Sequence, residues 1–477
     1  YMKYGAVLAS EPKKRIQETD MNKDKQPKKS YRVKCRSYDI YGRGVVSFNQ
    51  SKIPVEGLIG GEMAHICLKH TKTETIGILK EIEETSPERV TPPCPYHSRC
   101  GACQLMHMSY GEQLRFKEQM VREQLGKYCS VSPIIGMADP THYRNKVHAS
   151  FGRDRQGKIM AGIYEAGSHH IVPMENCLIQ NRTANEIIAD IRKIAVKLNI
   201  APYDEDRHTG ILRHVLIRTA YATGQVMVVP VVGRLNFKER QPFIKQLLAC
   251  HPEITTIVLN CNDAATSMVL GDREEVVYGD GTIEDELCGL KFCISPKSFY
   301  QVNPIQTQKL YEAAAEAAGL RKEDQVIDAY SGIGTIGLSV SRLVRSVTCV
   351  EINRAAVKNA RENAAKNGIT NIEFACRDAG QWIQEKARKG MHADVIFLDP
   401  PRSGCSMAFV RAMLSMHPDR IVYISCNAVT QKRDIEMMVR HGYEVTKLCP
   451  VDMFAMSYHT ENIAVLKRKF NGKAEDS

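Results

Sequence analysis

The stretch Asp328-Ala329-Tyr330-Ser331-Gly332-Ile333-Gly334-Thr335 joins the end of an apolar strand to the start of a helix. Glycines at such a junction let the backbone approach a ligand at the helix N-terminus and at the carboxyl ends of the strands. From Pro296 onward, helical and buried-strand patterns alternate, with strands expected near 324–329, 346–351, 371–376, 393–398 and 420–425 and two more at the C-terminus. This alternation predicts an α/β domain with an open, mostly parallel sheet over 296–470.

Four other segments flank this domain. Residues 1–30 are polar, mixed in charge and without apolar periodicity, so we expect a disordered basic tail there, and a short second tail over 471–477. Short β-rich runs punctuated by glycines over 31–90 predict a small five-stranded β-barrel. Residues 91–295 mix strands with two clear helices, which predicts a central α+β domain.

The composition narrows the class of protein. No run of about 18 apolar residues appears and the N-terminus lacks a signal-peptide pattern, so we expect a cytoplasmic protein without a membrane segment. In a reducing compartment, the 16 cysteines serve as core residues, metal ligands or nucleophiles rather than as disulfide partners. The net charge of +11 favours a polyanionic partner such as RNA or DNA, although part of the excess lies in the N-terminal tail.

The glycine loop predicts a nucleoside cofactor, which Gly332 and Thr335 would contact. Glu351 ends the next strand about 20 residues later, where a carboxylate can bind both hydroxyls of a ribose. The loop lacks the third glycine of a dinucleotide fingerprint, which favours S-adenosylmethionine over NAD. Asp378 follows the third strand, where it is either a ligand of the adenine amine or an ordinary exposed turn aspartate.

The fourth and fifth strands end in groups that fit chemistry on a pyrimidine ring. Asp399 begins a Pro-Pro loop that ends in Arg402, where amino-methylating enzymes carry an aromatic residue to stack on the base. Cys426 supplies a thiol that can add to C6 of uracil and turn the ring into an enolate that is nucleophilic at C5. Glu461, at the start of a C-terminal strand, is the candidate base that removes the C5 proton.

Several motifs, in this order along the chain, resemble the RNA 5-methyluridine methyltransferase family. The resemblance covers about 31–470 and is carried by the segment 295–303, the Asp328 and Asp399 loops, 425–427 with 433–434, and 452–454 followed by His459 and Glu461. It implies a Rossmann-like class I methyltransferase domain and an OB-like TRAM barrel at 31–90. It also implies that Gln301, Tyr330, Glu351 and Asp399 line the cofactor or active site, with Cys426 as nucleophile and Glu461 as base.

Four cysteines of the central domain form a candidate metal site: Cys94, Cys100 and Cys103 in one loop, and Cys177 further on. Four thiolates can hold a cubane iron–sulfur cluster. A structural zinc is the alternative, but it favours two close cysteine pairs and only one is present. Many members of the family carry this quartet, so the resemblance implies a 4Fe-4S cluster. Because methyl transfer is redox-neutral, we expect a structural or RNA-positioning role.

These features predict a monomeric enzyme that methylates C5 of a uridine in structured RNA, with no DNA partner. The layout resembles the bacterial 23S ribosomal RNA branch of the family more than the shorter transfer RNA enzymes. Transfer RNA remains an alternative substrate. Cytosine C5 methylation is a second alternative, although those enzymes usually carry proline or threonine before the cysteine, where Ser425 stands. A noncatalytic RNA-binding factor is a third.

Overall fold

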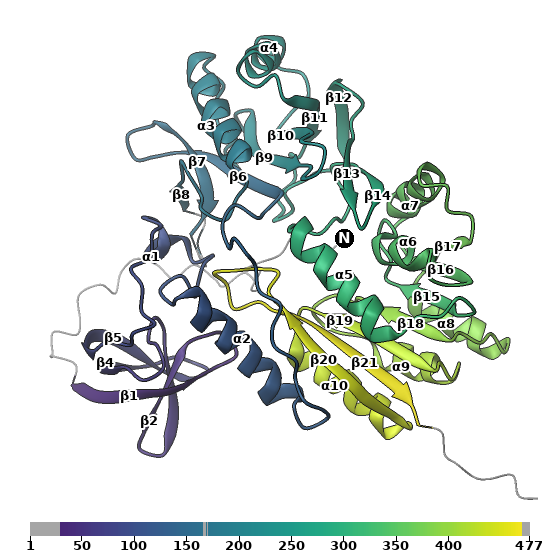
Figure 1. The fold of residues 1–477 in the computed structure, drawn as a ribbon. Helices are drawn as coiled ribbons and strands as arrows, with labels where there is room; N and C mark the ends of the chain where they lie inside the picture. Colours follow the sequence, from purple (N-terminus) through teal and green to yellow (C-terminus); the bar gives the residue numbers. More distant parts are fainter. Residues whose placement is uncertain (1–28, 166–167, 169, 470–477) are drawn as a thin grey trace, which may run out of the picture.

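The computed structural model describes residues 29–165, 168 and 170–469, so most of the N-terminal tail and all of the C-terminal tail lie outside the described residues. Figure 1 shows three units: a small barrel (purple), a central sheet with two helices (teal) and an α/β domain (green to yellow). None of the helices in the described ranges is long and apolar enough to cross a membrane.

The N-terminal unit is a closed five-stranded barrel, as the sequence predicted. Its strand order is β1-β2-β3-β5-β4. Alternate residues of the strands point inward, so that Val33, Val46, Val55 and Ile66 are buried together. The barrel sits beside the central unit and helix α2 (Figure 1). Its strands are β1 (Ser30–Tyr38), β2 (Gly44–Phe48), β3 (Ser51–Val55), β4 (Met63–His70) and β5 (Thr75–Glu84).

The central unit is a seven-stranded sheet with the order β12-β11-β10-β9-β6-β7-β8, antiparallel except where β10 pairs with β11. Helices α3 (Arg182–Lys197) and α4 (Arg240–Cys250) share one core with it. The hairpin of β13 (Ile283–Leu287) and β14 (Leu290–Ile294) leads into the last domain. The strands are β6 (Lys146–Arg153), β7 (Ile159–Tyr164), β8 (Ile171–Pro173), β9 (Leu212–Thr219), β10 (Val226–Val232), β11 (Ile254–Cys261) and β12 (Arg273–Tyr278).

The last unit is the α/β domain that the sequence predicted. Its sheet has the order β17-β16-β15-β18-β19-β21-β20. The first five strands pair in parallel, and β21 pairs antiparallel with both of its neighbours, β19 and β20. Every residue of β19 is buried, as expected for a strand with helices on both faces. The strands are β15 (Gln325–Ala329), β16 (Ser346–Glu351), β17 (Ile372–Cys376), β18 (Val395–Leu398), β19 (Arg420–Ser425), β20 (Tyr443–Val451) and β21 (Glu461–Arg468). The helices are α5 (Pro304–Ala318), α6 (Thr335–Ser341), α7 (Arg354–Lys366), α8 (Ala379–Arg388), α9 (Met407–Leu414) and α10 (Ala428–Arg440).

Part of the region expected to belong to the central domain packs elsewhere. After the short helix α1 (His97–Cys100), helix α2 (Tyr110–Leu125) lies against α10 and β20. The chain that follows α2 then pairs with the edge strand β20, through Val131 with Leu448 and Ile135 with Val451. The α/β domain is therefore covered in part by α2 and the segment that follows it, which lie between the barrel and the central unit in sequence.

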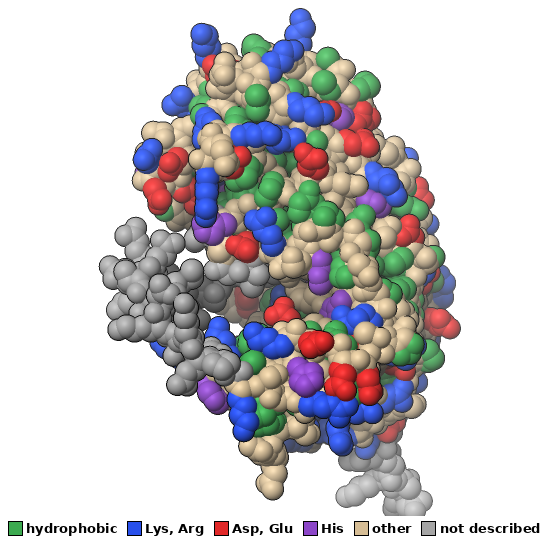
Figure 2. Space-filling view, turned by 90° about the vertical axis from the view of Figure 1, so that its left-hand side faces the viewer, with side chains coloured by type: hydrophobic (Ala, Val, Ile, Leu, Met, Phe, Trp, Pro, Cys, Tyr) green, Lys and Arg blue, Asp and Glu red, His purple; other side chains and the backbone are tan. Residues whose placement is uncertain are grey.

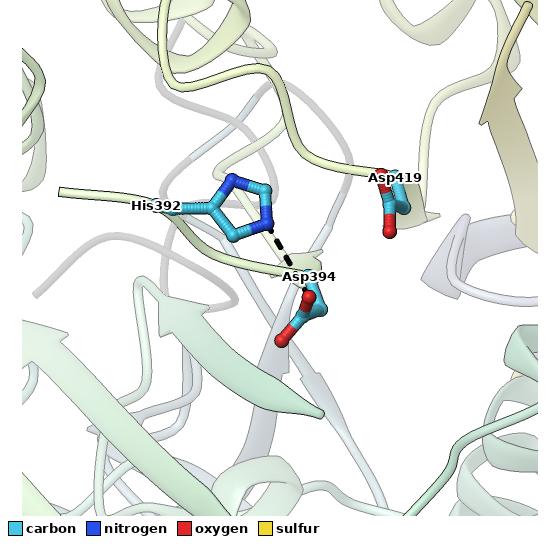
Figure 3. A group of neighbouring side chains, drawn as sticks. All are labelled: His392, Asp394 and Asp419. Atoms are coloured by element: carbon cyan, nitrogen blue, oxygen red, sulfur yellow. Dashed lines mark hydrogen bonds and ion pairs between the residues drawn. The ribbon is translucent and has the colours of Figure 1, made fainter. Parts of the chain in front are cut away.

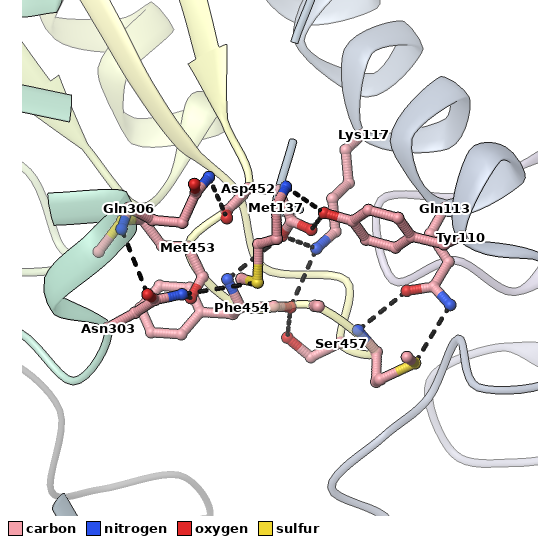
Figure 4. A network of polar contacts seen from close by, with 12 residues as sticks. Tyr110, Gln113, Lys117, Met137, Asn303, Gln306, Asp452, Met453, Phe454 and Ser457 are labelled. Atoms are coloured by element: carbon pink, nitrogen blue, oxygen red, sulfur yellow. Dashed lines mark hydrogen bonds and ion pairs between the residues drawn. The ribbon is translucent and has the colours of Figure 1, made fainter. Parts of the chain in front are cut away.

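A buried ion pair fixes α2 to the loop between β20 and β21 (Figure 4). Lys117 of α2 donates from Nζ to Asp452 Oδ1 at 2.6 Å and to the carbonyl of Phe454 at 3.0 Å. Tyr110 donates to the other carboxylate oxygen of Asp452 at 2.8 Å. Both charged side chains are fully buried. Burial lowers the pKa of Lys117, and the carboxylate of Asp452 counteracts that shift.

We expect Lys117→Met to destabilise the protein by about 3–5 kcal/mol, because the substitution leaves the carboxylate of Asp452 buried without its counter-charge. The midpoint of the urea-induced unfolding transition measures the loss. Lys358→Met, at a side chain that is 78% exposed, is the matched control and should change stability by less than about 0.5 kcal/mol. Equal midpoints for the two variants would show that the pair does not stabilise the fold.

Candidate active site

Three predicted site residues meet at one edge of the α/β sheet. Asp399 follows β18, Cys426 follows β19, and Glu461 is the first residue of β21. Strands β18 and β19 are parallel neighbours, and β21 runs antiparallel beside β19. Ser425 pairs with Asn462 in that register, so one further step along it sets Cys426 opposite Glu461. The sheet thus brings a thiol between two carboxylates.

The exposure of the three side chains differs in a way that suits the chemistry. Glu461 is 1% exposed and Asp399 is 8% exposed, whereas Cys426 is only partly buried. A nucleophilic thiol must be reachable by its substrate. A general base is more effective in a site from which water is excluded.

The start of α10 holds the Pro-Pro loop against Cys426. Asn427 caps the helix by accepting from the N–H of Val429, and its amide donates to the carbonyl of Arg402 at 3.2 Å. The hydroxyl of Thr430 donates to the same carbonyl at 3.1 Å. The loop that carries Asp399 and the residue after Cys426 therefore form one hydrogen-bonded unit.

Arg402 brings a permanent positive charge to this edge. Its guanidinium donates to Nε2 of His459 at 3.2 Å. Burial lowers the pKa of His459 to about 3, and the positive charge of Arg402 adds to the shift. The imidazole is consequently neutral and accepts this hydrogen bond at physiological pH. The sequence did not identify this contact, which joins the Pro-Pro loop to the segment before Glu461.

The glycine loop between β15 and α6 has the geometry of a ligand-binding turn. Tyr330, Gly332 and Gly334 all have positive φ angles, of 66°, 57° and 82°. That conformation is uncommon for a tyrosine and marks a turn held by its surroundings. Glu351 helps to hold it: one carboxylate oxygen accepts from the N–H of Gly332 at 3.0 Å and the other from Asn353 at 2.8 Å. Each oxygen keeps a second lone pair for a ligand hydroxyl.

Gln301, predicted to contact the cofactor, lies in the segment between β14 and α5. Its side chain is 3% exposed, and its Oε1 has no hydrogen-bond partner among the residues that the structure describes. A buried amide oxygen without a donor is costly, so this atom fits a ligand that supplies one. The central unit positions the segment, because Asn145 donates from Nδ2 to the carbonyl of Gln301 at 3.2 Å. Arg218 of β9 donates to the carbonyls of Pro296 and Ser298.

Two other residues near the loop have defined roles. Asp378 is exposed and caps α8 by accepting from the N–H of Gln381 at 2.9 Å. This position is compatible both with a ligand of the adenine amine and with an ordinary turn aspartate. Thr335 begins α6, and its hydroxyl lies 2.9 Å from that of Tyr311 on α5. Burial raises the pKa of Tyr311, and the carboxylate of Asp399 raises it further. Sequence analysis missed Tyr311, although a hydroxyl within the apolar face of a helix was a usable signal.

The four cysteines of the candidate metal site approach one another. Burial raises the pKa of the Cys103 thiol, and the thiols of Cys177, Cys100 and Cys94 raise it further. Among the described residues, however, no three of these sulfurs lie within 4.8 Å of one another.

A separate group of metal-ligand types lies far from this edge (Figure 3). His392 and Asp394 precede β18 and Asp419 precedes β19, so the group lies at the amino ends of the strands. Asp394 already accepts from the N–H of Gln325, and Asp419 accepts from the guanidinium of Arg468. These carboxylates stabilise strand ends and have no part in the candidate active site.

The fold and the loop geometry define a class I methyltransferase. Residues 109–469 match the family model described as tRNA (Uracil-5-)-methyltransferase, and the chain belongs to that family. Two bacterial proteins named as uncharacterized RNA methyltransferases are similar to it: one from Clostridium tetani is 39% identical, covering 94% of this chain and 98% of its own length. The other, from Halalkalibacterium halodurans, is 40% identical and covers 90% of this chain and 94% of its own.

A solved structure shares the whole architecture. The Pyrococcus abyssi tRNA (uracil-54, C5)-methyltransferase, in complex with S-adenosyl-L-homocysteine, matches with a TM-score of 0.75 and 24% identity. The match covers 91% of this chain and all of that one. At this identity the likeness concerns the fold, which confirms the predicted fold class.

We expect Tyr311→Phe to weaken binding of S-adenosyl-L-homocysteine about fivefold, the equivalent of one lost hydrogen bond of about 1 kcal/mol. The hydroxyl that fixes Thr335 at the cofactor loop would be missing. Titration calorimetry measures the Kd. Tyr443→Phe is the matched control, because its hydroxyl donates to the carbonyl of Pro418 at the opposite end of the sheet. An unchanged Kd for Tyr311→Phe would exclude a positioning role.

Proposed function

We propose that this protein transfers a methyl group from S-adenosylmethionine to C5 of a uridine in 23S ribosomal RNA. The observation that supports the reaction most strongly is the meeting of Asp399, Cys426 and Glu461 at one sheet edge, beside the glycine loop. Family membership supports uracil C5 as the acceptor. The choice of ribosomal RNA rests on the multi-domain layout with four cysteines, which resembles that branch of the family.

In this proposal each step follows from the position of a side chain. The target uridine leaves its stack to reach Cys426, since the ring is otherwise inaccessible in paired RNA. The thiolate adds to C6, and the negative charge passes to C5 and O4 of the ring. When bound, the cofactor would supply an electrophilic methyl group: the bond from C5 to the methyl carbon would form as the bond between that carbon and the cofactor sulfur breaks, leaving S-adenosylhomocysteine. Glu461 then removes the C5 proton, the C5–C6 double bond reforms and the bond between C6 and the sulfur breaks.

The cofactor would be held by Gln301, Tyr330, Gly332, Thr335, Glu351, Asp378 and Asp399. Gln301 offers a buried amide oxygen that lacks a donor among the described residues, and Glu351 offers lone pairs to ribose hydroxyls. Arg402 leaves a positive charge beside the Pro-Pro loop, where it can bind the uracil oxygen on which charge develops.

We further propose that Cys94, Cys100, Cys103 and Cys177 hold a 4Fe-4S cluster. The support is the proximity of the four cysteines, since the thiols of Cys177, Cys100 and Cys94 all raise the pKa of Cys103, together with the quartet that the family resemblance implies. The cluster would stabilise the central unit or position RNA, because methyl transfer needs no electron donor. A cytoplasmic location and a monomeric state complete the proposal.

We expect Cys426→Ala to abolish the covalent adduct that forms with RNA containing 5-fluorouridine, because fluorine cannot leave C5 as a proton. Ribosomal and transfer RNA transcripts, each made with 5-fluorouridine, are incubated with the protein and separated on denaturing gels. Cys250→Ala, at an exposed cysteine of α4, should retain the adduct. An adduct that survives Cys426→Ala would end the nucleophile assignment. Adduct with the transfer RNA alone would favour that substrate.

We expect anaerobically purified protein to contain about four iron and four sulfide ions per chain. Elemental analysis and visible absorption measure the content, and Cys103→Ser should lower it. Cys250→Ser is the control for substituting an unrelated cysteine. One zinc ion per chain in place of iron would overturn the cluster assignment without affecting the proposed reaction.

A further inference from the structure

A row of rings connects the barrel to the candidate active site. We call Tyr41, Tyr458 and His459 the aromatic array. The rings of Tyr41 and Tyr458 lie 5.5 Å apart and perpendicular, and those of Tyr458 and His459 lie 4.3 Å apart. Tyr41 belongs to the β1–β2 turn, whereas His459 lies two residues before Glu461. The array therefore begins at the barrel surface and ends at the proposed base.

The turn that presents Tyr41 is rigid. A carboxylate oxygen of Asp39 accepts from the N–H groups of Tyr41 and Arg43, both at 2.9 Å. The other oxygen pairs with the guanidinium of Arg43 at 2.6 Å. Gly42 has a φ of 75°, and a Cβ there would lie 2.4 Å from Leu105, so the turn packs closely on its neighbour. A turn held this firmly loses little conformational entropy when its side chains bind a ligand.

The outer ring of the array is open. Tyr41 is 49% exposed although its turn is fixed, and the guanidinium of Arg43 lies 5.5 Å from its ring centroid. Arg43 is already paired with Asp39 and Glu74, so its contribution is to hold the ring rather than to bind a further anion. An exposed tyrosine on a rigid support is typical of surfaces that stack on nucleic-acid bases.

A positive charge, that of Arg402, lies beside the inner end of the array. Burial raises the pKa of Tyr458, and the nearby guanidinium of Arg402 counteracts that shift. Arg402 donates to a neutral imidazole rather than to a carboxylate, so this contact does not neutralise its charge and the guanidinium remains attractive to RNA. On the face shown in Figure 2, between the barrel and the central unit, the molecule has a recess with histidine, lysine and arginine side chains along it, together with acidic ones. This combination of rings and cations favours RNA over an apolar protein segment.

We propose that the aromatic array stacks on unpaired RNA bases adjacent to the target uridine. The inference rests on the proposed function, and it names the contact that would compensate for extruding the base. When a uridine leaves its stack, its neighbours lose a stacking partner. Tyr41 and Tyr458 would replace that partner, so that bound RNA connects the barrel with the segment that carries Glu461. Stacking of this kind tolerates any base, because every base has a π face.

The test uses a short single-stranded RNA with a central 5-fluorouridine and 2-aminopurine on one or the other side of it. Binding to the wild-type protein should quench the 2-aminopurine fluorescence by stacking. Tyr41→Leu and Tyr458→Leu should lose the quenching and raise the Kd about tenfold, whereas Tyr→Phe at either position should restore both. Tyr221→Leu, at a 64% exposed tyrosine of the central unit, is the control and should behave as wild type.

The outcomes separate this inference from the proposed function. The stacking role would be overturned if wild-type protein did not quench the fluorescence. It would also be overturned if the two leucine variants quenched it as strongly as wild-type protein does. Formation of 5-methyluridine in unmodified ribosomal and transfer RNA is measured in parallel. If wild-type protein quenches the probe but makes no 5-methyluridine, the proposed reaction fails and the array stands. If all variants make 5-methyluridine with an unchanged KM, the reaction stands and the array fails.

Discussion

The buried pair of Lys117 and Asp452 is the constraint on which the active-site edge depends. Two opposite charges removed from water stabilise a fold only when their geometry is good and further hydrogen bonds support each of them. Here Lys117 also donates to the carbonyl of Phe454, and Asp452 also accepts from Tyr110 and from the N–H of Phe454. A loop anchored through a buried charge has few alternative conformations. The residues that follow, up to Glu461, start from a fixed point.

The same loop is also held by α5 of its own domain and by two segments from earlier in the chain. Gln306 of α5 donates to the carbonyl of Asp452, and Tyr143 donates to the carbonyl of Ala455. Gln113 of α2 accepts from the N–H of Met456. These contacts come from three segments far apart in sequence, and each bonds to the backbone rather than to a side chain. These bonds hold the backbone of the loop without using its side chains, and they add to the anchor that the side chain of Asp452 provides.

Much of the fold could be predicted from local patterns. The alternation of helix and buried strand gave seven strands of the α/β sheet, and the glycine-punctuated runs gave the barrel, because burial on one or two faces leaves a periodic trace. Asp399, Cys426 and Glu461 were predicted as site residues for a related reason: strand ends meet at one sheet edge, where the structure places all three. Lys117 and Asp452 lie 335 positions apart and leave no such trace. Their pairing, the packing of α2 on β20 and the bracing of the Gln301 segment by Asn145 depend on tertiary contacts.

The position of the cysteines shows what the proposed metal centre would do for a reaction that needs no electron transfer. Two residues beyond Cys103, the N–H of Leu105 donates to the carbonyl of Met456 in the anchored loop. Beyond Cys177, the carbonyl of Ile179 accepts from the N–H of Arg144, and the next residue, Asn145, holds the Gln301 segment. Both cysteine loops are therefore one or two hydrogen bonds from the loop that precedes Glu461 and from the Gln301 segment. Short loops with little apolar core have few other means of keeping their shape, and a shared centre would fix both at once. The requirement is geometric, so a bound centre could meet it without any change in its oxidation state.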